Sequence, residues 1–482
     1  MAPGMGSGGF KVRAGTPEAQ QWLDYGLKLY HAFYHDDAKA AFARAVDLDP
    51  TCALCAWGQA LGLGPTRNYK ISDEETATAL AAARRAFTLA RTPLERDLTA
   101  AIERRYRPEA SPEARAEAFA EAMSALADRY PGEPELAALA GHALLAADRD
   151  AAAIAILKRA LARDPNDTAA IHYYIHATDG GDRAADALPY AERLPGLAPN
   201  ASHLVHMAAH TLVRVGRYQE VAVVNARALK VDADYAQSMA YQGPLGEPRY
   251  YAHNMMFGVF GALMAGDRDL ALKYADHARV AFPDGADAMR RSIVAGQTGV
   301  AYGRFAPEKA LPPPPASDPA FHQIYWRYAR GEARAASGDA DGVLEESRRI
   351  EAIAVPDGGG LIELRLVAAK VLAGRAAMLT GDPAGAAKVY AAAAAVQEKA
   401  FADFADPPPW WYPLRRSVAA AKMKAGEYRA AAAEARASLR LGRPTAWRFA
   451  CSATPSGDWG IDAPPTGTGR KPAAPGGVTL TL

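Results

Sequence analysis

Apolar and small residues recur along this chain in blocks of two predicted helices, and each block ends in a proline or a similar turn. The prolines that close three successive blocks stand 34 residues apart: Pro131, Pro165 and Pro199. One further interval ends at Ala233, within another turn-like stretch. A fixed period of this length, with two helices in each block, predicts an array of helical hairpins that pack on their neighbours.

The points at which paired helices should touch carry small residues. When the closing proline is counted as position 32, positions 8, 20 and 27 are Gly26, Ala38 and Ala45 in the first block, Gly141, Ala153 and Ala160 in the block before Pro165, and Val259, Ala271 and Ala278 in the block before Pro283. A large side chain there would force the helices apart. This pattern resembles the tetratricopeptide repeat (TPR) family, and the resemblance implies an all-α, TPR-type α-solenoid superhelix.

The resemblance covers about residues 16–440, and the chain is expected to form one continuous superhelix. We divide it into a flexible, glycine-rich N-terminus, N-terminal helical repeats, central TPR repeats, a proline-rich linker, C-terminal helical repeats and a disordered tail: 1–17, 18–130, 131–300, 301–320, 321–450 and 451–482. Residues 241–251 interrupt the array as an insertion. Glycine-containing turns predict helix pairs around 321–353, 361–403 and 414–441.

Seven of the eleven histidines lie in the central repeats: His142, His172, His176, His203, His206, His210 and His253. They occupy positions 2, 5 and 9 of the first helix of their blocks, and their spacings of three, four and seven residues place them on one helix face. In TPR proteins these positions line the concave groove. Asp179, at position 12, belongs to the same predicted surface. His31, His35, His277 and His322 fall outside this stripe.

Histidines on adjacent first helices, about 8–10 Å apart, can converge on one metal ion. All seven histidines of the stripe, together with Asp179, are therefore candidate metal ligands. Imidazole-rich sites suit zinc, copper, iron and nickel. Copper is the preferred expectation because six histidines would hold two ions by three ligands each, and iron and zinc are the alternatives. The H-E-x-x-H arrangement of zinc proteases is absent from the sequence.

The central stretch also resembles a group of bacterial TPR proteins that is rich in histidine and mostly without assigned activity. The matching segments are Ile171-His-Tyr-Tyr-Ile-His-Ala177, His203-Leu-Val-His-Met-Ala-Ala-His210 with Val215-Gly-Arg-Tyr218, Ala252-His-Asn254 and Asp406-Pro-Pro-Pro-Trp-Trp-Tyr-Pro413. Met256 stands where that group often has a further histidine, so one ligand is either lost or replaced by a thioether.

The leading hypothesis is a metal-dependent oxidase or oxygenase that acts on a small molecule or peptide in the groove. Tyr174, beside the histidines, and Arg214, at position 13, are the candidate catalytic residues, and Arg214 would hold a substrate carboxylate. Two alternatives stay open: a TPR scaffold that binds a protein or peptide partner without metal, and a zinc hydrolase.

Charge and cysteine content limit the other possibilities. Lys and Arg total 55 and Asp and Glu total 54, so the chain lacks the basic surface that nucleic acid would require. No apolar stretch is long enough for a membrane span and no signal-peptide pattern opens the chain, so a cytoplasmic protein is expected. Cys52 and Cys55 have the spacing of a redox or metal pair, but we expect two buried structural cysteines.

Overall fold

A computed structural model of the chain describes residues 1–11, 15–66, 70–180, 183–238, 250–282, 288–309, 312–356, 358, 360–401 and 408–441. Its elements in these ranges are α-helices and one short 3-10 helix, with no strand. The predicted all-α helical-repeat fold is therefore confirmed. Contacts divide the chain into two compact units, where one continuous superhelix was expected.

The first unit contains Met1–Asp179 and Arg183–Thr211. Its helices are α1 (Pro17–His31), α2 (His35–Leu48), α3 (Ala53–Gly62), α4 (Asp73–Leu89), α5 (Pro93–Arg104), α6 (Pro112–Arg129), α7 (Glu135–Ala146), α8 (Asp150–Arg163), α9 (Thr168–Asp179), α10 (Ala184–Ala191), α11 (Leu194–Leu197) and most of α12 (Ser202–Arg214). Reciprocal capping boxes begin two of them, Ser72 with Glu75 at α4 and Thr92 with Glu95 at α5, and satisfy main-chain donors that the helix leaves open.

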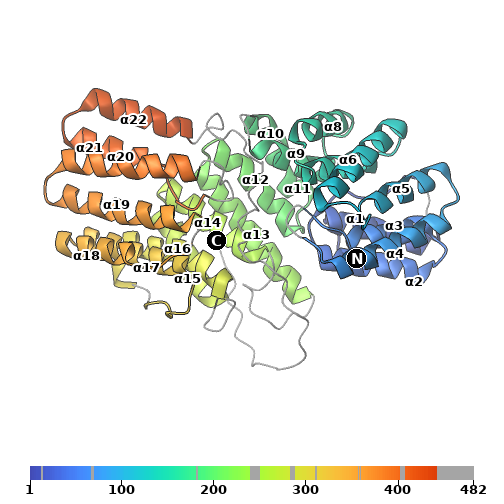
Figure 1. Cartoon of the computed structure of the whole chain (residues 1–482), viewed down its shortest axis with the longest axis horizontal. Coiled ribbons are helices and arrows are strands. Elements are labelled where there is room, and N and C mark those ends of the chain that lie inside the picture. The colour runs from blue at the N-terminus through green and yellow to red at the C-terminus, as the bar shows by residue number, and fades with distance from the viewer. Residues whose placement is uncertain are drawn as a thin grey trace. The chain divides into compact units, whose positions relative to one another are not determined.

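The second unit holds the residues from Leu212 onward. Its helices are α13 (Tyr218–Ser238), α14 (Tyr251–Ala265), α15 (Arg268–Ala281), α16 (Ala288–Phe305), α17 (Ala320–Ala336), α18 (Ala340–Glu351), α19 (Leu361–Leu379), α20 (Pro383–Ala400), α21 (Arg415–Lys424) and α22 (Tyr428–Leu441). The 3-10 helix η1 (Pro307–Lys309) follows α16. Figure 1 shows α17 to α22 as stacked antiparallel hairpins, which confirms the three predicted C-terminal helix pairs.

Close helix contacts occur at the small residues that the repeat pattern singled out. A Cβ atom on Gly26 would lie 2.5 Å from the ring of Phe42, and one on Gly141 would lie 2.5 Å from Leu157. Ala38 and Ala153 are fully buried between their helices. Side chains larger than these would push the paired helices apart, so the steric reason for the pattern is confirmed.

One expectation from the sequence differs from the structure, and two others concern residues that the structure does not describe. The chain's first residues were expected to be flexible, but Met5 and Phe10 are buried and the main chain from Ala2 to Lys11 is hydrogen-bonded to the first unit. The predicted tail at 451–482 and most of the insertion at 241–251 lie outside the described residues. None of the described helices is long and apolar enough to cross a membrane.

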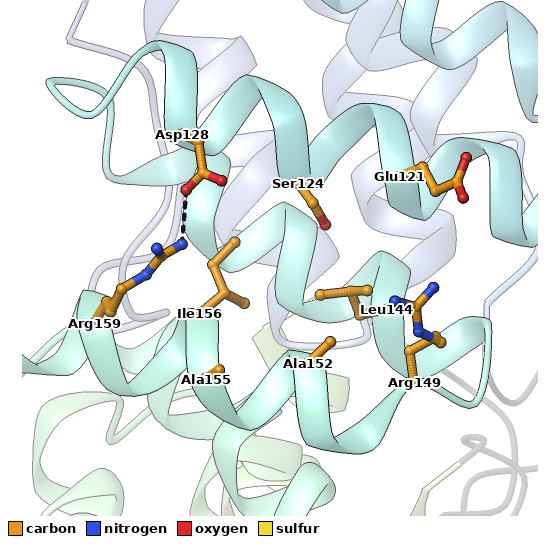
Figure 2. Close-up of a pocket in the computed structure, with 9 residues that line it drawn as sticks. All are labelled: Glu121, Ser124, Asp128, Leu144, Arg149, Ala152, Ala155, Ile156 and Arg159. Atoms are coloured by element: carbon orange, nitrogen blue, oxygen red, sulfur yellow. Dashed lines mark hydrogen bonds and ion pairs between the residues drawn. The ribbon is translucent and has the colours of Figure 1, made fainter.

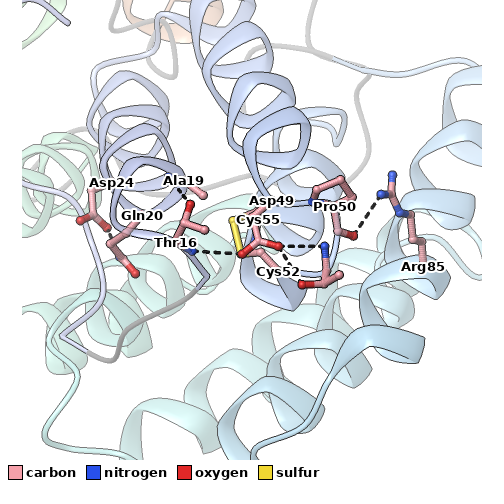
Figure 3. Close-up of a disulfide and its surroundings, with 10 residues drawn as sticks. Thr16, Ala19, Gln20, Asp24, Asp49, Pro50, Cys52, Cys55 and Arg85 are labelled. Carbon is pink, nitrogen blue, oxygen red and sulfur yellow. Dashed lines mark hydrogen bonds between the residues drawn. A yellow bond between two sulfur atoms is a disulfide. The ribbon is translucent and has the colours of Figure 1, made fainter.

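Cys52 and Cys55 are buried as expected, but they form a disulfide with each other (Figure 3). The Cys52 sulfur also accepts a hydrogen bond from the Cys55 N–H and caps the start of α3. Thr16 and Asp49 lie beside this disulfide, where the Thr16 N–H donates a hydrogen bond to the Asp49 carboxylate. The interpretation of two separate structural thiols is therefore corrected to a covalent link inside one turn.

Candidate histidine metal site

Three histidines of the predicted stripe meet inside the first unit, and we call them the three-histidine cluster: His172 and His176 on α9, and His203 on α12. Each offers one nitrogen, and these nitrogens all lie within 4.8 Å of one another. His172 and His203 are buried, and their Nε2 atoms are 3.1 Å apart. Two nitrogens bound to one ion at about 2.0–2.1 Å would be separated by about 2.8–3.4 Å, so this pair has the spacing of metal ligands.

The other ring nitrogen of His172 fixes which face of the imidazole points into the cluster. His172 Nδ1 lies 2.7 Å from the main-chain oxygen of His31, so it carries the proton and donates it to that carbonyl. Nε2 therefore presents its lone pair toward His203. An Nδ1–H bond to a main-chain carbonyl is a common way in which proteins orient a metal-binding histidine. Burial lowers the pKa of His172 to about 3, which keeps the imidazole neutral.

A second pair of histidines on α12 repeats this arrangement. His206 Nε2 and His210 Nε2 lie 3.0 Å apart. His210 Nδ1 lies 3.1 Å from an oxygen of Asp179, the carboxylate that ends α9. The ring of His210 is 5.6 Å from that of His176, so the pair adjoins the three-histidine cluster. Asp179 therefore orients His210, and its own role as a metal ligand stays a prediction.

Phe33 fills the space beside the cluster, although the sequence analysis did not select it. Its ring centroid is 4.6 Å from that of His172 and 4.8 Å from that of His203, and the Phe33 and His203 rings are stacked. The Phe33 backbone is left-handed, with φ of 62°, an unusual conformation for a bulky residue. Residues held this way persist where their surroundings determine them, and such residues gather at functional sites.

The signal that could have identified Phe33 is its place in the repeat. The turn that follows the first helix of a block takes a positive φ at position 15, and other blocks place Gly216 and Gly266 there. Glycine adopts this conformation without steric cost. A phenylalanine at a glycine position is therefore a departure from the pattern that points to a requirement for the ring.

His31, which the sequence analysis placed outside the stripe, also belongs to these surroundings. It is fully buried at the end of α1, and its Nε2 lies 2.6 Å from the Glu135 carboxylate of α7. Its Nδ1 lies 2.9 Å from the hydroxyl of Tyr173. A chain of contacts thus runs from Glu135 through His31 to His172, whose Nδ1 is held by the His31 carbonyl. His31 therefore adjoins the histidine site in space, although its sequence position lies outside the stripe.

His142 takes a different place from the three-histidine cluster. Its ring stacks on Tyr173 at a centroid distance of 4.6 Å, and its Nε2 is buried without a hydrogen-bond partner among the described residues. Burial, assisted by the nearby charge of Arg105, holds the pKa of His142 well below its usual value. Its role as a metal ligand stays a prediction.

The two candidate catalytic residues and the seventh histidine lie on three different helices: Tyr174 on α9, Arg214 on α12 and His253 on α14. The ring of Tyr174 lies 5.7 Å from Tyr190 of α10, and it is Tyr173 that contacts the histidines. Arg214 ends α12 and is buried in the second unit. His253 lies on α14, also in the second unit, with its ring 5.0 Å from Phe257. The roles proposed for these three residues stay predictions.

A hollow of about 430 Å³ lies elsewhere in the first unit, between α6 and α8 (Figure 2). Ion pairs span it, including one of 2.8 Å between Arg159 and Asp128, and its floor is formed by small apolar side chains such as Ala152 and Ala155. No histidine lines it. The hollow therefore provides no opening to the histidines.

Comparisons with known proteins give distant structural similarities and no family match. No family model and no curated protein matches the chain. Among solved structures it is similar to the human IFIT1 dimer with PPP-AAAA, at 15% identity, 78% coverage of this chain, 72% of that chain and a TM-score of 0.33. It is also similar to yeast Tom70, at 11% identity, 87% and 90% coverage and a TM-score of 0.30.

A third similar structure is the P58(IPK) TPR domain, at 12% identity, 85% and 98% coverage and a TM-score of 0.26. Scores this low carry no argument about site or function. The chain is thus an all-α protein of TPR-like helical hairpins, with buried histidines gathered in its first unit.

Proposed function

We propose that the first unit binds a transition metal ion through His172, His176 and His203. The observation that carries this proposal is the 3.1 Å separation of His172 Nε2 and His203 Nε2, with His172 Nδ1 already engaged by a carbonyl oxygen. A lone pair oriented in this way, with a third imidazole nitrogen within 4.8 Å, supplies three imidazole ligands for one ion. His206 and His210 form an adjacent pair for a second ion.

A competing explanation is an N–H···N hydrogen bond between two neutral imidazoles, which has nearly the same length. Two features favour metal. The arrangement occurs twice within one unit, at His172–His203 and at His206–His210. In each pair the outward nitrogen of one histidine, His172 or His210, is held by an oxygen, as in metal sites with oriented imidazoles.

The ligand set consists of imidazoles, which favours copper, with iron and zinc as alternatives. With copper or iron, the activity we propose is that of an oxidase or oxygenase acting on a small molecule or peptide in the cytoplasm. With zinc and a bound water it would be hydrolysis. Tyr173 and Phe33 would exclude water from the cluster, and Asp179 would hold the orientation of His210.

The test is metal binding by the full chain after removal of metal with a chelator. Copper, zinc and cobalt are titrated separately, and bound metal is counted by plasma mass spectrometry after desalting. Cobalt additionally gives a visible absorption band that reports the ligand geometry. The decisive variant is His203→Ala. The matched control is His322→Ala, because His322 is also buried but pairs with Asp318 in the second unit.

We expect at least one equivalent of metal on the parent chain and on His322→Ala, and a loss of at least a hundredfold in affinity for His203→Ala. If the parent chain binds none of these metals, the proposal fails. The alternative is then a repeat scaffold without metal that binds a protein or peptide partner, which the TPR-like fold also suits. Oxygen consumption is tested only once copper or iron has been found.

A further inference from the structure

Residues Met1–Lys11, which we call the strap, lie without helix or strand against α1, α7 and α9 of the first unit. Met5 and Phe10 are buried, and the Phe10 ring meets that of Trp57 edge to face at 5.6 Å. A glycine-rich segment has little apolar surface to bury and loses much conformational entropy when it is ordered. The surface beneath the strap must therefore supply specific contacts.

Those contacts are made mainly to the main chain of the strap. The Gly9 N–H donates to Glu135 at 2.8 Å, and the Lys11 N–H donates to Glu133 at 2.8 Å. Asn200 binds two carbonyl oxygens of the strap. Its side-chain amide donates to the Pro3 oxygen, and its main-chain N–H donates to the Gly4 oxygen. Such contacts recognise an extended backbone irrespective of most side chains.

Ser7 adds a reciprocal pair of bonds at the start of α9. The Ser7 N–H donates to the Thr168 hydroxyl at 2.6 Å, and the Thr168 N–H donates to the Ser7 hydroxyl at 3.1 Å. Asp167 accepts from the next two N–H groups of the helix, those of Ala169 and Ala170. The N–H groups in the first turn of α9 are therefore bonded partly by Asp167 and partly by Ser7 of the strap.

The glycines of the strap are required by close approach. A Cβ on Gly8 would lie 2.6 Å from the main-chain nitrogen of Lys28 and 2.9 Å from the carbonyl carbon of Leu27. These are main-chain atoms of α1 and cannot move aside. A Cβ on Gly6 would lie 2.5 Å from the Thr168 hydroxyl, and one on Gly9 would lie 2.7 Å from Asp24. The surface thus selects glycine at three places and an aromatic residue next to the last.

We propose that this surface, formed by Asp24, Tyr25, Glu133, Glu135, Thr168 and Asn200, is a binding site for an extended glycine-rich segment of another polypeptide, and that the strap fills it in cis. The partner has the pattern Gly-x-Gly-Gly followed by an aromatic residue. It carries no acidic residue in this stretch, because Asp24, Glu133 and Glu135 would repel one. The strap satisfies each of these requirements.

Occupation of the surface extends to the neighbourhood of the histidines. Glu135 accepts from Gly9 through one oxygen and contacts His31 through the other, at 2.8 and 2.6 Å. A peptide on this surface therefore contacts the carboxylate that positions His31. The inference itself does not depend on the metal proposal, since none of its contacts involves the three-histidine cluster.

The experiment uses a fluorescent synthetic peptide with the sequence of Met1–Lys11, the full chain, and a chain that lacks residues 2–11. Fluorescence anisotropy should show saturable binding to the shortened chain and at least tenfold weaker binding to the full chain, whose site is already filled. A peptide carrying Gly8→Ala should bind at least tenfold more weakly. A peptide carrying Met1→Ala is the control, because Met1 is 61% exposed.

The shortened chain must retain its helical circular dichroism for this comparison. If the shortened chain unfolds, binding of the strap is tested instead by hydrogen exchange of the full chain, with mass spectrometry of the N-terminal fragment that contains the strap. The Gly9 and Lys11 amides should be protected in the parent, exposed in Gly8→Ala, and exposed when excess unlabelled peptide competes. A folded, shortened chain that binds the Gly8→Ala peptide as well as the parent peptide overturns the proposal. Strap amides that exchange as fast as those of the free peptide also overturn it.

Discussion

The two units bury polar side chains between their helices in opposite ways. In the second unit, Glu332 of α17 lies between Arg304 of α16 and Arg375 of α19, with nitrogen–oxygen distances of 3.4 and 3.1 Å. In the first unit, the buried polar groups include facing imidazoles, since His172 Nε2 and His203 Nε2 lie 3.1 Å apart. In an ion pair each charge neutralises the other. Two facing imidazole lone pairs, in contrast, are stabilised when a cation lies between them.

The second unit uses these buried polar groups for its own cohesion, and our proposal is that the imidazoles of the first unit are arranged for a metal ion. The Glu332 carboxylate raises the pKa of the Arg375 guanidinium above its usual range. Burial lowers the pKa of His142 and His172 instead, so both imidazoles stay neutral. Substitution should therefore affect folding in one unit and ligand binding in the other.

The largest expected effect is that of Glu332→Ala in the second unit. It removes a buried carboxylate and leaves the partly buried Arg375 and Arg304 without their counter-charge, which should lower the free energy of unfolding by about 3 kcal/mol. Urea unfolding followed by circular dichroism measures it. Glu345→Ala is the control, because its pair with Arg349 is about half exposed and should contribute less than about 1 kcal/mol. Equal effects of the two variants would show that Glu332 stabilises the second unit no more than an exposed ion pair does.

Phe33→Gly tests whether aromatic packing, and not charge, holds the histidines of the first unit. Loss of the buried ring should lower the free energy of unfolding by about 3–5 kcal/mol, and release of the left-handed backbone should return about 1 kcal/mol. The net loss is about 2–4 kcal/mol, with weaker metal binding in the same titration as above. Phe33→Leu keeps the backbone strain, so it measures the loss of the aromatic ring separately from the release of strain. A Phe33→Gly chain more stable than the parent would show that the ring is not needed.

Acidification should destabilise the metal-free first unit. The pKa values of His142 and His172 lie below 6.5 in the folded chain, so below that pH the unfolded chain binds protons that the folded chain does not. Stability is then full above pH 6.5 and falls by about 1.4 kcal/mol per pH unit for each histidine, or about 2 kcal/mol each at pH 5. Urea unfolding at pH 7, 6 and 5 measures this dependence.

Asp167 acts in the opposite direction and provides the control. Burial raises its pKa to about 6, so its folded carboxyl group takes a proton below pH 6, before the unfolded group does. This term increases stability as the pH falls from 6 to 4. Asp167→Asn removes it and keeps a side-chain oxygen for the helix cap. The acid-induced loss should therefore be steeper in Asp167→Asn, and identical slopes would contradict the assignment.

Reduction of the Cys52–Cys55 disulfide should have the smallest effect. The bond closes a very short loop, so its loss should lower the free energy of unfolding by no more than about 2 kcal/mol. Bound metal should not change, because neither cysteine belongs to the three-histidine cluster. Thermal unfolding and metal counting with and without a phosphine reductant test both statements. Metal lost together with the disulfide would link the thiol state to the site.

The sequence by itself determined the repeating helical hairpins and the helix face on which the central histidines lie. The 34-residue period fixed the hairpins, and small residues such as Gly26 and Gly141 fixed their contacts. His172 and His176 are one helical turn apart, so their common direction follows from helix geometry alone. These features are local, and a local pattern is sufficient to predict them.

Only the tertiary structure decided which side chains meet. His31 ends α1 and Phe33 follows it, more than a hundred residues before α9, and no periodicity relates them to His172. The same holds for the strap and for Glu135, and for the fact that Tyr173, not Tyr174, faces the histidines. Helical periodicity gives the direction of a side chain on its own helix. The packing of distant helices supplies its neighbours, and those neighbours fix tautomer, pKa and the position of a ligand.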